Sequence, residues 1–389
     1  MSAPVQTAQH GLTEHSHGGW GLVPVQTRSE RFASVDPAAF PEVTGREIEW
    51  KLTPVEKVRH LIDGELDGSP YAILYPEAAG TSVEWIDRTD AVIGSVGVPE
   101  DKATANARSS FENALHIRLE GDAEALTVTR ADLGSTPRAA HTVITATKGS
   151  SGLIVLDSRG SANLVESVEI DVQDDANVTV VSVQEWDDDA IQLASQFARV
   201  GRNATLKHIV ISLGGSVVRV NPSVRLAGEG ADGTLLGVYF ADAGQHLEQQ
   251  VYLHHEAAHT RGRVTYKGAL NGEGARTVWV GDVLIGRDAT GTDSYEQNRN
   301  LVLSDGTRAD SIPNLEIETG DIAGAGHASA TGRFDDEHLF YLQARGIPED
   351  EARRLVVLGF LSEIVQQIGE PALEARLIQA LETELEAAR

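Results

Sequence analysis

The sequence predicts a mainly β protein, in which a long run of stacked strands lies between a small α/β segment and C-terminal helices. From about His116 to Gly332, a small polar turn precedes a short β-rich run again and again, and no long helical pattern interrupts the series. The 389 residues include 38 Gly but only 13 Pro, which is typical of many turns between short strands. This repeat indicates a solenoid, although the pattern alone leaves a β-sandwich or a jelly roll open.

Four domains are predicted from this pattern. They are a flexible tail, an N-terminal α/β cap, the strand-rich core and a C-terminal helical domain, with the bounds 1–31, 32–115, 116–332 and 333–389. The tail is polar and lacks a hydrophobic period. Its histidines could hold a metal only weakly, and a mobile polar tail is the favoured interpretation of His10, His15 and His17.

The cap combines short helical and short extended patterns. The segment 54–62 begins with proline and repeats apolar residues at helical spacing, which predicts a helix. We expect strands over 71–75 and 91–93, and a second helix over 102–115. This mixture distinguishes the cap from the repeats that follow it.

Three helices are predicted after Gly332, over about 335–345, over 348–368 and from Pro371 onward. Acidic first turns and glycine stops define the first two, and Pro371 opens the third. The middle helix has two apolar stripes and must therefore be covered on two faces. The favoured interpretation is a core helix of a three-helix bundle. The alternative is that the second stripe docks a partner protein through Val357, Leu358, Leu361 and Val365.

Composition excludes several classes of partner. The net charge of −26 makes phosphate backbones and anionic lipid poor partners, so we expect neither nucleic acid nor a membrane surface. No stretch approaches the roughly 20 apolar residues of a membrane span, and residues 1–13 do not resemble a secretory signal. The chain has no Cys, so it offers neither disulfides nor thiolate ligands. We expect a cytoplasmic protein.

One motif suggests an enzyme but lacks the context that the enzyme needs. The segment 255–259 (HEAAH) matches the H-E-x-x-H pattern of zinc proteases, which binds zinc only when a helix brings both imidazoles to one metal. Strand-like runs flank it, so we expect no zinc site. The chain also lacks a P-loop, a G-x-S-x-G elbow and a thiol nucleophile, and no ordinary hydrolase chemistry is indicated.

His327 is the remaining candidate for chemistry. It lies in an expected small-residue loop, 321–332 (DIAGAGHASATG), where a second chain could approach the ring. From the residues alone, a structural or solvated histidine is favoured over a metal ligand.

Three stretches carry a more specific signal than the repeat does. They are 47–53 (EIEWKLT); 266–268 (YKG) with 295–297 (YEQ) and 300–304 (NLVLS); and 311–317 (SIPNLEI) with 326–332 (GHASATG) and 335–347 (DDEHLFYLQARGI). Together they resemble the SufB/SufD family of the SUF system, which assembles iron–sulfur clusters. The resemblance spans about 32–367, nearly the whole chain.

The resemblance implies a right-handed parallel β-helix between the N-terminal domain and the C-terminal helices. It implies two partners: a SufB paralogue that pairs through the β-helix, and the ATPase SufC, which docks on the helical domain around Leu358 and Leu361. It also implies a transient iron–sulfur cluster shared with the paralogue. A reduced flavin in the complex and a homodimer without SufB stay open.

Within the family, the residues favour the SufD branch. SufB-like chains carry a Cys after a matching Gln, where this chain has Asn298, and they flank the loop His with Glu, where this chain has Gly326 and Ala328. His327 matches the SufD-like His, and Ala325 stands where some SufD chains have a Cys. The resemblance therefore implies a scaffold, not an enzyme, that contributes His327 as a ligand to the cluster or its iron.

Two rival classes remain. A β-helix carbohydrate-active enzyme, exported or cytoplasmic, would line a groove with carboxylates and bases. A homodimeric regulatory protein would have no contact with a cluster. Co-purification with a tagged ATPase subunit separates the scaffold from both.

Overall fold

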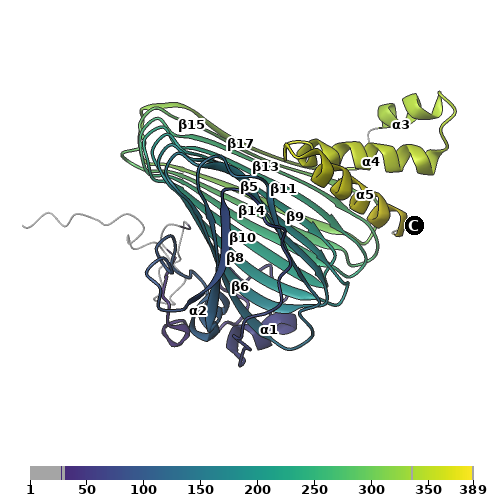
Figure 1. Cartoon of the computed structure of the whole chain (residues 1–389). Coiled ribbons are helices and arrows are strands. Elements are labelled where there is room, and N and C mark those ends of the chain that lie inside the picture. Colours follow the sequence, from purple (N-terminus) through teal and green to yellow (C-terminus); the bar gives the residue numbers. More distant parts are fainter. Residues whose placement is uncertain (1–27, 29–30, 334–335, 388–389) are drawn as a thin grey trace, which may run out of the picture.

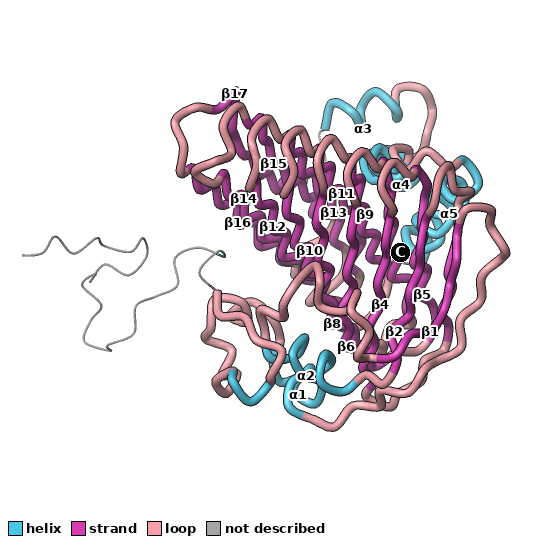
Figure 2. The backbone as a smooth tube through the Cα atoms, turned by 60° about the vertical axis from the view of Figure 1, so that its left-hand side comes forward, coloured by secondary structure: helices cyan, strands magenta, loops and turns pink. Residues whose placement is uncertain are grey.

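The computed structural model describes residues 28, 31–333 and 336–387, and the chain winds into a parallel β-solenoid of about eight turns with helices at both ends (Figures 1 and 2). His10, His15 and His17 lie outside the described residues. Two sheets form the walls. In spatial order, sheet A contains β1 (Thr81–Asp87), β2 (Asn113–Leu119), β4 (Arg138–Ala146), β6 (Asn163–Val172), β8 (Ile191–Val200), β10 (Val217–Leu226), β12 (His246–His255), β14 (Arg276–Ile285) and β16 (Arg308–Ile317). Sheet B contains β17 (Ile322–Gly332), β15 (Thr292–Val302), β13 (Arg261–Leu270), β11 (Asp232–Ala241), β9 (Thr205–Leu213), β7 (Asn177–Trp186), β5 (Ser151–Gly160) and β3 (Leu126–Ala131).

Each turn of the solenoid contributes one strand to each sheet. Neighbouring strands pair in parallel, and paired residues lie 26 to 32 positions apart in the sequence. Among the described strands only β1 pairs antiparallel, with β2. This parallel pairing confirms the predicted solenoid, because a sandwich or a jelly roll is built from antiparallel sheets.

The two ends of the solenoid differ. At the first turn, Tyr71, Ile73 and Trp85 pack against the interior, and Leu74 forms a bridge to Thr129 of β3. At the other end, β16 and β17 are the outermost strands of their sheets, and no described segment pairs with their free edges (Figure 2). The described part of the chain therefore covers its first turn and leaves its last turn open.

The predictions for the cap are correct only in part. The helix α1 (Val55–Asp63) is confirmed. The expected strands are wrong, because 71–75 forms a single bridge and 91–93 lies in a turn, whereas β1 was missed. The helix α2 (Lys102–Ser110) is shorter than expected, because 113–119 alternates Leu115, Ile117 and Leu119 into the solenoid interior and forms β2.

Helices cover the outer faces of both sheets (Figure 1). The helices α1 and α2 pack against sheet A, whereas α4 (Glu349–Val365) and α5 (Pro371–Ala387) pack against sheet B, and α3 (Asp336–Gln343) contacts α4. The predicted glycine stops are confirmed, since Gly346 and Gly369 have φ of 86° and 84°. Among the described helices, none is long and apolar enough to cross a membrane.

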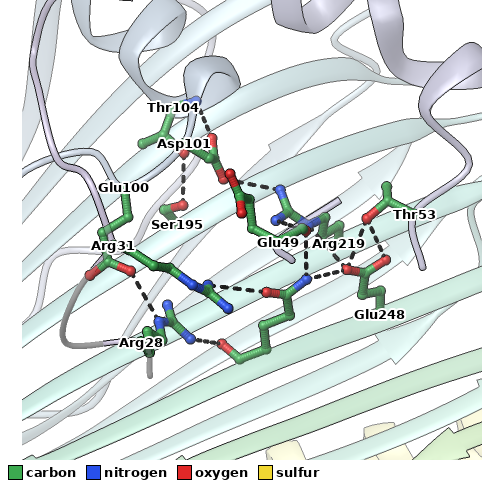
Figure 3. A network of polar contacts seen from close by, with 11 residues as sticks. Arg28, Arg31, Glu49, Thr53, Glu100, Asp101, Thr104, Ser195, Arg219 and Glu248 are labelled. Atoms are coloured by element: carbon green, nitrogen blue, oxygen red, sulfur yellow. Dashed lines mark hydrogen bonds and ion pairs between the residues drawn. The ribbon is translucent and has the colours of Figure 1, made fainter. Parts of the chain in front are cut away.

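A buried ionic network joins the N-terminal domain to sheet A (Figure 3). Glu248 of β12 is fully buried and accepts hydrogen bonds from Thr53, Arg219 and Gln250, at 2.9, 3.2 and 2.6 Å. The ring of His246 lies 2.9 Å away. Burial alone would raise the pKa of Glu248, but the contact with His246 and the charge of Arg219 hold it at about 2.

The segment 47–53 supplies much of this network. The carbonyl of Glu49 accepts a 2.9 Å hydrogen bond from Arg219, and the ring of Trp50 lies 4.2 Å from the same guanidinium. Arg219 also pairs with Asp101, which caps α2. This sequence motif therefore supplies one of the contacts that fix the N-terminal domain on the solenoid.

Candidate functional site

His327 lies at the open end of the solenoid, on β17 and not in the expected loop. Its register partner on β15 is Glu296. Paired residues of stacked parallel strands point in the same direction, so His327 faces the interior side of the last turn. Its side chain is still 44% exposed, since no described strand covers β17.

Glu296 lies directly beneath His327 in the stack. Its side chain is 1% exposed, and its Oε1 is 3.7 Å from Nδ1 of His327. Neither carboxylate oxygen accepts a hydrogen bond of good geometry from the described residues. Burial and the nearby charge of Asp282 raise the pKa of Glu296 to about 8, although the Asn314 backbone N–H opposes the shift.

A glycine on the opposite wall makes room for this carboxylate. A Cβ at Gly281 of β14 would lie 2.3 Å from Oε2 of Glu296 and equally close to the ring of Trp279. Such a contact is far inside van der Waals distance, so Gly281 permits the position of Glu296.

The next interior side chain on β15, Asn298, is fully hydrogen-bonded. Its amide nitrogen donates to the hydroxyl of Tyr239 at 2.8 Å, and its carbonyl oxygen accepts from Asn300 and from Ser311. Asn300 also donates to Thr331 of β17, at 3.3 Å. Asn298 therefore stabilises the last turns and has no spare group for a ligand.

A cleft of about 330 Å³ gives access to His327. Arg28, Tyr252, Pro313 and Leu315 also line it. Among the described residues, no cluster of three or more His, Asp or Glu side chains could hold a metal. The open end thus offers the accessible imidazole of His327 beside the buried carboxyl group of Glu296, and Asp282 and Glu316 also line the cleft.

The apolar stripe predicted to bind a partner is mostly buried within this chain. Val357, Leu361 and Val365 are at most 1% exposed and pack between α4, α5 and sheet B; Leu358 is partly buried in the same cluster. The second face of α4 is therefore covered by the chain itself. Exposed aromatic rings lie instead on α3, where Phe340 is 73% and Tyr341 54% exposed.

The HEAAH segment forms no metal site in the structure. His255 ends β12, is buried, and contacts Thr260 and Ser294 at 2.8 and 2.9 Å. His259 lies in the following turn with φ of 57°. The two histidines lie at a strand end and in a turn, which confirms the non-helical context predicted for this segment.

Sequence reasoning found His327 but missed Glu296 and Gly281. The one available signal in the sequence was the alternation of side chains along a strand, which places Ser294, Glu296, Asn298 and Asn300 on one face. The opposite face of that strand is also mostly polar, so the pattern does not say which face is inside.

Comparison with known proteins gives a consistent match. Residues 128–360 match the family model "SUF system FeS cluster assembly, SufBD core domain". The chain is 46% identical to an iron–sulfur cluster assembly SufBD family protein of Mycobacterium bovis, over 99% of this chain and 97% of that protein. A protein of the same description in Mycobacterium leprae is 46% identical over 91% of this chain and 93% of its own. A second M. leprae protein of that description is 33% identical over 56% of this chain and 25% of its own length.

Proposed function

The chain belongs to the SufBD family of iron–sulfur cluster assembly proteins, and we propose that it is a non-catalytic scaffold subunit of the cytoplasmic SUF complex. The observation that carries the proposal is the asymmetry of the solenoid. The first turn is covered by the chain itself, whereas β16 and β17 leave their edges free in the part of the chain described, with His327 beside them. A free strand edge is a template for a strand of another chain.

The proposed occupant of the open end is a SufB paralogue. This chain has no Cys, so a cluster at His327 needs thiolates from elsewhere. The hydrogen-bonded Asn298, at the position where SufB-like chains carry a Cys, supports the SufD branch. The presence of two family members in M. leprae supports a pairing of paralogues.

Co-expression with a tagged paralogue tests this pairing. Ile317, at the end of β16, is 43% exposed, and Ile317→Lys should lower co-purification because it places a charge at the open end. Leu74→Lys is the matched control, since Leu74 is 72% exposed at the covered end. The proposal would be contradicted if both variants co-purified with the paralogue equally well. It would also be contradicted if the chain formed a homodimer in place of the complex, or if it cleaved polysaccharide.

The ATPase SufC is proposed to dock on α3 and the neighbouring surface of α4. The exposed pair Phe340 and Tyr341 supports this surface, because exposed aromatic residues commonly anchor interfaces. The buried Leu361 cannot anchor a partner without unfolding, so Leu361→Asp should destabilise the helical domain instead of acting selectively.

Phe340→Asp should weaken binding of the ATPase by tenfold or more, since loss of an aromatic anchor commonly costs about 2 kcal/mol. Calorimetric titration of the full chain with the ATPase measures the effect, and Leu74→Asp serves as the control at the far end. Unchanged affinity of Phe340→Asp would show that α3 is not the interface.

His327→Ala should leave the stability and the pairing of the chain near normal but lower the cluster content of the complex. The ring is 44% exposed and its strand neighbours are small, so its removal loses little packing. Iron and sulfide content and the melting temperature are measured on the same complex. A normal cluster content would remove His327 from the chemistry, and a large fall in melting temperature would show that its role is structural.

A further inference from the structure

Glu296 is a buried carboxylate that no contact in the fold explains. Other buried glutamates have charged partners, such as Glu166 with Arg130 at 2.6 Å and Glu248 with Arg219 at 3.2 Å. Glu296 is equally buried, but neither carboxyl oxygen has a hydrogen-bond partner of good geometry among the described residues, and Nδ1 of His327 lies 3.7 Å from Oε1. A buried carboxyl group without a charged partner is costly to ionise, so a cation bound beside Glu296 would stabilise its charged form.

The geometry around Glu296 suits a metal ion. Two ligands of one tetrahedral metal, each at about 2.1 Å, are about 3.4 Å apart, and Oε1 of Glu296 is 3.7 Å from Nδ1 of His327. A small side-chain rotation is enough to close this difference. Both residues lie on neighbouring strands in register, which holds their backbones rigidly.

We propose that Glu296 and His327 form a two-ligand half-site for a divalent transition-metal ion such as ferrous iron. Imidazole and carboxylate are the ligand types that non-haem ferrous iron prefers. The ion would supply the positive charge that the carboxylate lacks, and it could enter through the cleft at His327. Only the identity of the metal, as iron for cluster assembly, rests on the proposed function.

The test is anaerobic titration of the isolated full-length chain with ferrous iron, and with cobalt(II) as a spectroscopic probe. We expect one ion per chain. Glu296→Gln and His327→Ala should each weaken binding by about tenfold or more. Gly281→Ala should also weaken it, because the added Cβ displaces the carboxylate.

Glu318→Gln is the matched control, since Glu318 lies just after β16 but pairs with Arg287 at the surface; its affinity should equal that of the wild type. The inference is overturned if the wild type binds no ion, or if Glu296→Gln binds as well as the wild type. Co-purification with the paralogue is measured separately on the same variants. If the wild-type chain fails to co-purify with the paralogue, the proposed function is contradicted, but the proposed half-site is not.

Discussion

Glu248→Ala is expected to release the N-terminal domain from the solenoid. The substitution leaves Arg219, which is 2% exposed, without one of its two carboxylate partners, and removes the acceptor for Thr53. Breaking a buried ion pair from one side costs about 3–5 kcal/mol. Because Thr53 lies just before α1 and Asp101 caps α2, the loss should fall on these two helices.

Hydrogen exchange of the α1 and α2 amides measures this effect directly, since local opening is reported by local protection. The control is Glu120→Ala, which breaks an ion pair with Arg118 at 2.7 Å whose carboxylate is 63% exposed. A surface pair of that kind is worth about 0–1 kcal/mol. If exchange in α1 and α2 changes no more for Glu248→Ala than for the control, the network does not hold the domain.

His208→Leu is expected to stabilise the chain, and most strongly in mild acid. His208 points into the solenoid between its register partners Val180 and Leu235, and neither ring nitrogen has a hydrogen-bond partner among the described residues. Removal of these unpaired buried polar atoms should raise the free energy of unfolding by about 1–3 kcal/mol at neutral pH.

The acid effect follows from the pKa of His208, which burial lowers from 6.5 to about 4. The unfolded chain takes up a proton at higher pH than the folded chain, so wild-type stability falls as the pH drops below about 6.5. By about pH 5 the loss is about 2 kcal/mol. Urea unfolding at several pH values should show that His208→Leu lacks this loss.

His208→Gln separates the two contributions. Glutamine does not titrate but keeps unpaired polar atoms in the interior, so it should remove the acid loss without the gain at neutral pH. If the free energy of unfolding of the wild type and that of His208→Leu change with pH in parallel, the ring of His208 gains a hydrogen-bond partner in solution.

The solenoid was predictable because its turns repeat in composition, but its period was not. One full turn takes 26 to 32 residues, yet it contains two strands joined by corners of unequal length, so spacing counted from strand to strand varies. The α/β cap was predicted less well, because a strand such as β1 takes its place from the neighbour that it covers.

The residues of the candidate site were also predictable only in part. His327 stands out in the sequence as a ring among small residues, and a single strand is enough to notice it. Glu296 and Gly281 acquire meaning only when β14, β15 and β17 are brought together. Likewise, the two stripes of α4 predict a helix covered twice, but only the packing shows that α5 and sheet B cover it.

The covering of a single end also limits the size of any assembly. A solenoid with two free ends can add copies head to tail without limit and grow into a fibre, as heterologous contacts that do not close tend to do. Here β1, which runs antiparallel to β2, and the segment around Tyr71 lie over one end, so the parallel stacking of the solenoid does not continue there. Under the proposed pairing, an assembly would therefore hold two solenoids, with His327 at the plane where they meet.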